Sequence, residues 1–248
     1  MKETILFVHG VCHGAWCWEE KFIPYFQELG YKCIALNLPG HETPGSTLRI
    51  SYSLNDYVQA LHQAVEKLDQ PPIIIGHSMG GMILQRFLKT GNCKKAILMA
   101  SVPPSGALMA SLRVIIQNLG TLPYLFTGNL LGVFRKYPQL MFNEAKIAEK
   151  YAPKMCAESF LAFLALVLPI FHKITTPLLV IGGSKDQLIT VDEFTQTANR
   201  YGAKLEIIEG GSHDLMLDDD YIKTAGAIKN WLSEKNQQIS RPCHSKPR

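Results

Sequence analysis

The sequence lacks the features that mark membrane-spanning, secreted and nucleic-acid-binding proteins. Its 248 residues include no apolar run long enough to cross a bilayer, and lysine and arginine are scattered without a basic block. The formal net charge is only +4, so neither nucleic acid nor an anionic membrane surface is an expected partner. The apolar run from Ile5 to Val8 is too short for a signal-peptide core, and we expect no secretion signal.

The six cysteines also lack the patterns that would give them a structural role. No Cys-x-x-Cys pair is present, and no group of His, Cys, Asp and Glu has the spacing of a metal site. Without a secretory context, reduced thiols and a cytoplasmic location are expected. We therefore expect no metal and no organic cofactor. Hydrophobic residues make up 47% and charged residues 19% of the chain, as in an ordinary globular protein.

Apolar segments typical of strands and of helices alternate along most of the chain. A helix is predicted to begin after Ser53, with Asp56 as the acid of a capping box. Six strands are predicted, at Thr4 to Val8, Cys33 to Leu36, Ile73 to Ile75, Lys94 to Ala100, Leu178 to Ile181 and Leu205 to Ile208. Alternation of this kind predicts an α/β fold with a mostly parallel sheet flanked by helices.

The alternation stops between residues 103 and 175. This segment has apolar helical stretches and no convincing strand, although a crossover between parallel strands needs only about a dozen residues. We interpret 103–175 as a helical cap inserted after the strand that ends near Ala100; an extra packing layer far from the site is the alternative. The core then comprises 1–102 and 176–235, and the polar stretch 236–248, which contains Cys243, is expected to be a disordered tail.

A nucleophile is predicted where the third strand ends. Gly76-His77-Ser78-Met79-Gly80 follows the buried strand at once, and apolar residues at helical spacing come directly after it. A Gly-x-Ser-x-Gly sequence between a strand and a helix forms a sharp turn that holds the serine hydroxyl above the sheet. The flanking glycines allow backbone segments to approach closely. His77, beside Ser78, is expected to have a structural role.

A base and an acid that orients it follow the last two strands. Asp186 comes after the strand that ends at Ile181, and His213 comes after the strand that ends at Ile208. Loops beyond the carboxyl ends of parallel strands meet at one edge of a sheet. We therefore expect Ser78, Asp186 and His213 to form a catalytic triad, because a serine hydroxyl needs a base and that base needs an orienting partner.

Other acidic residues fit the orienting role less well. Asp214 is adjacent to His213 in sequence, too close to turn toward its ring easily. Asp192 lies at the start of a predicted helix, and the acids at 218–220 precede the last helix, where negative charge stabilises a helix N-terminus. Asp186 is therefore the predicted triad acid.

Two backbone N–H groups are expected to stabilise the oxyanion that forms when the serine attacks a carbonyl. Met79, directly after the nucleophile, supplies one, and Val11 in the loop after the first strand supplies the other. Gly10 lets that loop turn back over the site. Gly10, Cys12 and Trp16 are expected to line the substrate pocket. Cys12 has no separate base, so we interpret it as pocket wall and not as a nucleophile.

These motifs, in the order Ser, Asp, His, resemble the α/β-hydrolase fold superfamily of serine hydrolases over nearly the whole chain outside the cap. A narrower resemblance, to plant-type methylesterases and hydroxynitrile lyases, rests on the loop His9-Gly10-Val11-Cys12-His13-Gly14-Ala15-Trp16-Cys17-Trp18. It implies that esterases have Gly in the His-Gly pair, whereas the lyases have Thr there and Lys directly after the catalytic His. Gly10 and Asp214 occupy these positions here, which favours hydrolysis over cyanohydrin cleavage.

The leading hypothesis is a serine hydrolase that cleaves a small carboxylic ester through an acyl-enzyme. The same triad serves thioesterases, lactonases and perhydrolases. A hydroxynitrile lyase, or a small-molecule-binding protein with little turnover such as the receptors of this family, are further alternatives. Apolar residues of the loop and cap indicate an ester with an apolar portion. A homodimer is also open, because an apolar cap surface covers either a pocket or a partner.

Overall fold

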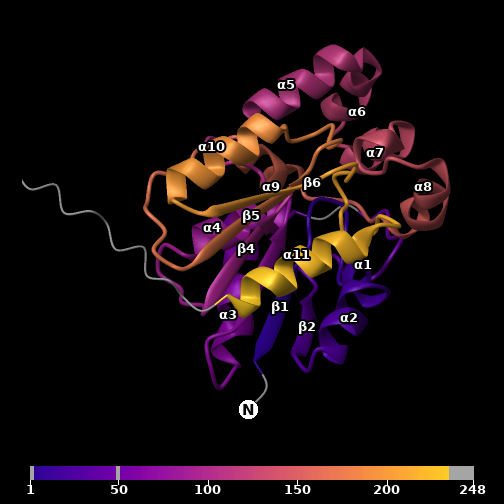
Figure 1. The fold of residues 1–248 in the computed structure, drawn as a ribbon. Helices are drawn as coiled ribbons and strands as arrows, with labels where there is room; N and C mark the ends of the chain where they lie inside the picture. The colour runs from indigo at the N-terminus through magenta and orange to yellow at the C-terminus, as the bar shows by residue number, and fades with distance from the viewer. Residues whose placement is uncertain (1–2, 49–50, 235–248) are drawn as a thin grey trace, which may run out of the picture.

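A parallel sheet forms the centre of the computed structural model, which describes residues 3–48 and 51–234 (Figure 1). Its six strands lie in the order β2-β1-β3-β4-β5-β6, and every neighbouring pair is parallel. The strands are β1 Thr4–Val8, β2 Lys32–Leu36, β3 Ile73–His77, β4 Lys95–Met99, β5 Leu178–Gly183 and β6 Lys204–Ile208. The predicted α/β fold is confirmed, and each predicted strand is present.

Helices connect the parallel strands, as this topology requires. The core helices are α1 Trp16–Glu19, α2 Phe22–Glu28, α3 Leu54–Glu66, α4 Met79–Phe87, α10 Val191–Tyr201 and α11 Tyr221–Ser233. α3 packs against α4, and α11, in front of the strands in Figure 1, contacts α2. The predicted capping box begins α3: the Asp56 N–H donates to Ser53 Oγ at 3.2 Å, and the Asp56 carboxylate accepts from the Ser53 N–H at 2.7 Å.

The segment between β4 and β5 is helical. It contains α5 Leu108–Gln117, α6 Leu122–Phe126, α7 Leu130–Lys136, α8 Ala145–Tyr151 and α9 Phe160–Ala165, with short 3-10 helices at Leu119–Thr121, Pro138–Leu140 and Ala152–Lys154. In Figure 1, α5 to α8 lie beyond the carboxyl ends of the strands. The predicted tail 236–248, with Cys243, lies outside the described residues.

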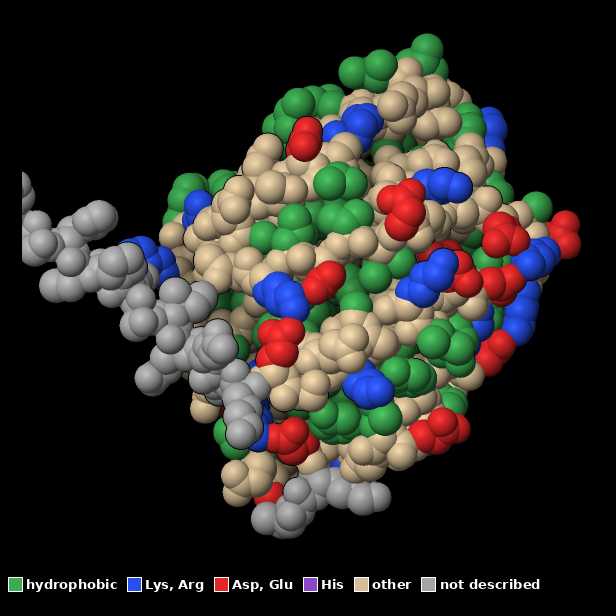
Figure 2. All heavy atoms as spheres, viewed as in Figure 1, with side chains coloured by type: hydrophobic (Ala, Val, Ile, Leu, Met, Phe, Trp, Pro, Cys, Tyr) green, Lys and Arg blue, Asp and Glu red, His purple; other side chains and the backbone are tan. Residues whose placement is uncertain are grey.

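The outer surface of this helical segment is apolar. Met109 and Ile116 of α5 and Phe126 of α6 are 65%, 73% and 88% exposed, and hydrophobic side chains gather at the top of the molecule in Figure 2. These helices are nevertheless short. Within the described part of the chain, no helix combines the length and the apolar character that a membrane span requires.

The order of the strands reverses beside β1. β2 lies on one side of β1 and β3 on the other. Where the order reverses in an open α/β sheet, loops at the carboxyl ends of the strands diverge and leave a crevice that receives ligands. Here the loop after β1, which carries Val11, and the turn after β3, which carries Ser78, border that crevice.

Glycines let the turn after β3 approach its neighbours closely. A Cβ atom added to Gly76 would lie 2.5 Å from the Gly80 carbonyl oxygen, and one added to Gly80 would lie 2.3 Å from the Val8 carbonyl oxygen. At Gly81 the added atom would lie 2.2 Å from Ser101 Oγ. Each distance is far inside van der Waals contact, so this turn accommodates only glycine at these positions.

A Gly80→Ala variant is expected to lose about 2–3 kcal/mol in the free energy of unfolding, because its methyl group meets fixed backbone of β1. Gly226→Ala is the matched control. Gly226 lies inside α11, and the nearest atom to a Cβ built there is the Tyr25 hydroxyl oxygen at 4.0 Å. Alanine at that position should raise the free energy of unfolding by about 0.5–1 kcal/mol. Urea unfolding measures both, and a shift of the same sign in the two variants would contradict this packing.

Candidate active site

Ser78 occupies the turn between β3 and α4 in a conformation that few residues other than glycine adopt. Its φ is 52° and its ψ is −116°. Hydrogen bonds hold the turn: the Ser78 N–H donates to the Met99 carbonyl at 3.0 Å, and the Ser78 carbonyl accepts from Gly81 and Val102 at 3.0 and 3.2 Å. Backbone strain of this kind persists only where the surroundings enforce it, and it is concentrated at functional sites.

His213 and Asp186 meet above the carboxyl ends of β5 and β6. His213 Nδ1 and Asp186 Oδ2 are 2.8 Å apart, and both side chains are at most 1% exposed. The second oxygen of Asp186 accepts the N–H groups of Leu188 and Ile189 at 2.8 and 3.0 Å. These bonds fix the carboxylate, and the carboxylate in turn orients the ring so that Nε2 is the nitrogen left for a reacting group.

The remaining nitrogen of His213 is available to Ser78. His213 Nε2 is buried and has no hydrogen-bond partner within 3–48 and 51–234, and His213 and Ser78 line the same cavity. In unliganded enzymes the bond between nucleophile and base is often long and shortens only when substrate is bound. The structure therefore joins His213 to Asp186 and places His213 and Ser78 on the wall of one cavity, and the triad itself stays a prediction.

The surroundings of His213 favour its protonated form. Burial by itself lowers the pKa of a histidine, but the charge of Asp186 and the hydrogen bond to it outweigh burial, so the pKa of His213 is raised above its ordinary value. Asp214 and Asp218 act in the same direction. The imidazolium that forms when His213 takes a proton is stabilised by the same charges.

The two residues predicted to form the oxyanion site lie at the start of α4 and on the cavity wall. Met79 is the first residue of α4, so its N–H has no acceptor within the helix. Val11 lines the cavity together with Ser78. Their role as donors to the oxyanion stays a prediction.

A buried ion pair that the sequence analysis missed lies beside the site. Asp214 Oδ2 is 3.1 Å from His13 Nε2, and both side chains are 0% exposed. Burial opposes the charge on both groups, but their mutual attraction outweighs it: the pKa of Asp214 is lowered and that of His13 is raised. His77 Nε2 lies 3.0 Å from the His213 carbonyl oxygen, and burial lowers the pKa of His77 to about 3, so that ring stays neutral.

Asp218 precedes α11 as expected, but it has a further role that the sequence analysis missed. Its carboxylate accepts the Ser212 N–H at 2.8 Å and the Ser212 hydroxyl at 2.6 Å. The Asp218 side chain thereby fixes the loop directly before His213. No local pattern distinguishes Asp218 from the two acids that follow it, so sequence alone offered no signal for this role.

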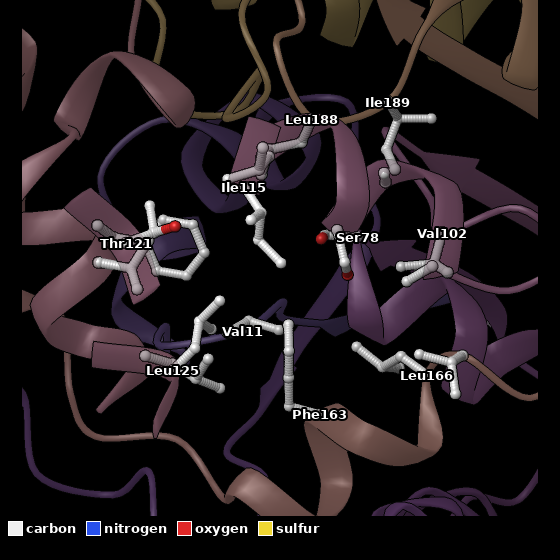
Figure 3. A pocket seen from close by; sticks show the side chains of 18 of the residues that line it. Val11, Ser78, Val102, Ile115, Thr121, Leu125, Phe163, Leu166, Leu188 and Ile189 are labelled. Carbon is white, nitrogen blue, oxygen red and sulfur yellow. The ribbon is translucent and has the colours of Figure 1, made fainter. Parts of the chain in front are cut away.

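An apolar cavity of about 270 Å³ lies above Ser78 (Figure 3). The core contributes Val11, Ser78 and His213 to its wall, and the cap helices contribute most of the rest. Only four of the residues that line it have polar side chains: Ser78, Ser111, Thr121 and His213. The cavity is therefore suited to an apolar group held next to the nucleophile.

Three loop residues predicted to line the pocket are absent from the wall of this cavity, and that prediction is corrected. They are Gly10, Cys12 and Trp16. Gly10 packs against the turn instead, because a Cβ atom there would lie 2.9 Å from the Cβ atom of Ser78. Trp16 is only 6% exposed and stacks on His13, with ring centroids 5.2 Å apart.

Cys12 takes part in a contact between the core and the cap. Its N–H donates to Glu158 Oε2 at 3.2 Å, and His41 Nε2 is 3.2 Å from the same oxygen. Glu158 Oε1 accepts the Tyr57 hydroxyl at 2.9 Å. The thiol of Cys12 is fully buried, and burial raises its pKa well above the ordinary value. An activated nucleophile would have a lowered pKa, so this thiol is structural.

The fold agrees with the comparisons to known proteins. The family model described as "Alpha/beta hydrolase family" matches residues 5–226. This chain therefore belongs to the α/β-hydrolase family. Part of the chain is also similar to individual plant proteins.

Methylesterase 2 of Arabidopsis thaliana is 39% identical to this chain over 87 residues, which is 34% of the chain and 32% of that protein. Salicylic acid-binding protein 2 of Nicotiana tabacum is 39% identical over 88 residues, 34% of either protein. The matches thus span about a third of these relatives, and they confirm the resemblance to plant methylesterases. The solved structure of a lipase-esterase related protein from Clostridium acetobutylicum ATCC 824 shares the fold, with a TM-score of 0.71 at 21% identity over 92% of this chain and 93% of that one.

The Asp214→Asn variant is expected to lose roughly 3–5 kcal/mol in the free energy of unfolding, because it leaves the His13 imidazolium buried without a counter-charge. Asp192→Asn is the matched control. Asp192 is an exposed acid in the first turn of α10, and its loss should change stability by less than about 0.5 kcal/mol. Denaturant unfolding of both variants tests the difference; equal stability of the two would show that the pair contributes nothing.

The effect should also depend on pH in a defined way. The lowered pKa of Asp214 gives stability that is present above about pH 4 and is lost as pH falls through the folded-state value. The raised pKa of His13 gives stability that is complete below about pH 6.5 and is lost as pH rises through its folded-state value. The difference between wild type and Asp214→Asn should therefore be largest between these limits and smaller in alkaline solution.

Proposed function

We propose that this protein is a carboxylic ester hydrolase that works through an acyl-enzyme on Ser78. The observation that carries the proposal is the 2.8 Å contact between His213 and Asp186, together with the cavity that both His213 and Ser78 line. The printed names of the relatives, which include several methylesterases, support the same class of reaction.

The proposed reaction has two halves. Ser78 Oγ attacks the ester carbonyl carbon while its proton passes to His213 Nε2, and Asp186 stabilises the imidazolium. The N–H groups of Val11 and Met79 donate to the oxyanion. His213 then gives the proton to the departing alcohol, the carbon–oxygen bond breaks, and an acyl-Ser78 remains. Water attacks this acyl group by the same route, which releases the acid and restores the serine.

The cavity supports an apolar substrate. Its wall is formed almost entirely by aliphatic and aromatic side chains, and the polar atoms needed for catalysis are concentrated at Ser78 and His213. Burial of a hydrocarbon group at this position contributes binding energy of about 25 cal/mol per Å² of apolar surface removed from water. A small carboxylic ester with one apolar portion is therefore the proposed substrate class.

Hydrolysis is favoured over cyanohydrin cleavage at two positions. Gly10 has no room for a side chain, because a Cβ atom would lie 2.9 Å from the Ser78 Cβ atom. Position 10 therefore offers no threonine hydroxyl. At position 214, where the lyases have lysine, this chain has Asp214, which is paired with His13 and is absent from the cavity wall. The two features that the resemblance links to the lyases are thus both replaced.

Exposure to a fluorophosphonate should add one adduct to wild type, because an activated serine attacks phosphorus without any requirement for a particular acyl group. The Ser78→Ala and His213→Ala variants should form no adduct or form it at least about a hundredfold more slowly. Replacement of the exposed Ser105 by alanine should leave labelling unchanged. Intact-protein mass gives the readout. A folded wild-type protein that forms no adduct would refute the proposal and favour a binding protein.

Ester hydrolysis should decline in acid as His213 becomes protonated, since only the neutral ring accepts the proton of Ser78. Because the pKa of His213 is raised, the midpoint of the decline in kcat/KM should lie above about pH 6.5. Asp186→Asn removes the main charge that raises this pKa, so its residual activity should have a midpoint at lower pH. A wild-type midpoint below that of the variant would contradict these assignments.

A further inference from the structure

The outer side of the cap has an apolar surface that nothing in the described part of the chain covers. Figure 1 shows α5 and α6 at the top of the molecule, and hydrophobic side chains project there in Figure 2. Six side chains that are 43% to 88% exposed form this cap patch: Leu108, Met109, Leu112, Ile116, Leu119 and Phe126. Exposed apolar residues gathered in this way mark a surface that binds another apolar body.

The cap patch and the cavity are two sides of the same helices. In α5, Ile115 lines the cavity, and the adjacent Ile116 is 73% exposed on the outside. In α6, Leu125 lines the cavity, and the adjacent Phe126 is 88% exposed. A helix that is apolar on several sides is normally surrounded by apolar material, either a protein core or lipid. Here the cavity side is enclosed and the outer side is not.

The cap patch lies in a part of the chain that has no acidic residue. Residues 103–143 include neither Asp nor Glu, and their basic residues are Arg113, Arg135 and Lys136. Arg113 is compensated by Glu193, whose carboxylate oxygen is 2.8 Å away. Arg135 and Lys136, in the last turn of α7, form no ion pair within residues 3–48 and 51–234. The cap patch is therefore associated with uncompensated positive charge.

Lys136 brings this charge to the edge of the cap patch. Its ammonium nitrogen is 5.6 Å from the centre of the Tyr124 ring, and it would lie 3.1 Å from a Cβ atom added to Gly120, which follows Leu119 of the patch. Apolar side chains bordered by cations match a bilayer surface, where anionic headgroups lie just outside hydrocarbon. A second copy of the chain fits less well, because a twofold contact through the patch would bring the same cations of both copies together.

We propose that the cap patch docks on the surface of a membrane that contains anionic phospholipid. Ile116 and Phe126 enter the boundary between headgroups and acyl chains, and Lys136 contacts the phosphate groups. The scattered Lys and Arg residues of the sequence predicted no such partner, but that expectation took no account of the segment that lacks acids. Docking goes beyond the proposed function, and it places the helices of the cavity wall against the phase in which an apolar ester dissolves.

Sedimentation with vesicles tests the docking. Wild type is expected to bind vesicles that contain phosphatidylcholine and phosphatidylglycerol in roughly equal amounts, and to bind vesicles of phosphatidylcholine alone more weakly. Added salt should reduce the difference between the two kinds of vesicle, because it screens the attraction to the headgroups and leaves the apolar contact in place.

The variant Ile116→Ser/Phe126→Ser should lower the vesicle partition coefficient at least about tenfold, because two apolar side chains no longer enter the membrane. Leu29→Ser/Ile222→Ser is the matched control. Leu29 ends α2 and Ile222 lies in α11, and their side chains are 42% and 59% exposed outside the cap. Vesicle binding by this control should equal that of wild type. Thermal unfolding checks that both double variants are folded.

The charge is tested in the same assay. Lys136→Gln should weaken binding to the mixed vesicles by about fivefold and leave binding to phosphatidylcholine alone unchanged, because one cation less faces the anionic headgroups. Lys229→Gln, which removes an exposed lysine of α11, should change neither.

Three results would overturn the docking. The first is a wild-type protein that does not bind vesicles, and the second is binding that Ile116→Ser/Phe126→Ser does not weaken. The third comes from sedimentation velocity without lipid: a wild-type dimer that dissociates in this double variant, together with no vesicle binding, would assign the cap patch to a second copy of the chain.

Fluorophosphonate labelling keeps this inference separate from the proposed function. The six side chains of the cap patch are absent from the cavity wall, so both double variants should be labelled at the wild-type rate without lipid. A wild-type protein that binds vesicles and forms no adduct would support the docking and refute the hydrolase. A labelled protein that ignores vesicles would do the reverse.

Discussion

The close approach of α4 to β1 is the constraint on which the site depends. Gly80 lies against the carbonyl groups of Val8 and His9 with no space for a methyl group. This contact fixes the first turn of α4 next to the end of β3. Ser78, which joins the strand to the helix, therefore adopts a strained backbone conformation with φ 52°. Packing in the core is thus the source of the free energy that holds the nucleophile in an unfavourable conformation.

Buried charged groups hold the loop after β1, which packs against this turn at Gly10. The pair of Asp214 and His13 and the network centred on Glu158 both take groups that are normally exposed and place them among apolar neighbours. Ion pairs of this kind seldom add stability relative to apolar residues, but they admit few alternative partners. They tie the loop after β1 to the loop after β6 in one case and to the cap in the other, so the two sides of the cavity share a common base.

The residues that repeat a local pattern were predictable, and those that depend on distant partners were not. The six strands, the capping box of α3 and the turn at Ser78 each follow from neighbouring residues, and the meeting of Asp186 with His213 follows from the rule that loops of a parallel sheet converge at one edge. His13 and Asp214 are 201 positions apart, and Cys12 and Glu158 are 146 apart. Nothing near any of these residues indicates its partner, and polar side chains are assigned to the surface by default.

The pocket wall failed to follow from sequence for a related reason. Cys12 and Trp16 follow Val11 in the loop after β1, yet the chain bends at Cys12, where φ is 61°, and the Trp16 ring stacks on His13. The cavity is formed instead by cap helices whose apolar residues have no marker that separates lining from packing.

Gly10 lies so close to Ser78 that the packing of the site restricts which residue can occupy this position. A side chain at this position and the present position of Ser78 exclude one another, since their Cβ atoms would be 2.9 Å apart. A change toward the residue that the lyases of this type have in the same loop therefore requires the loop and the turn at Ser78 to move apart together.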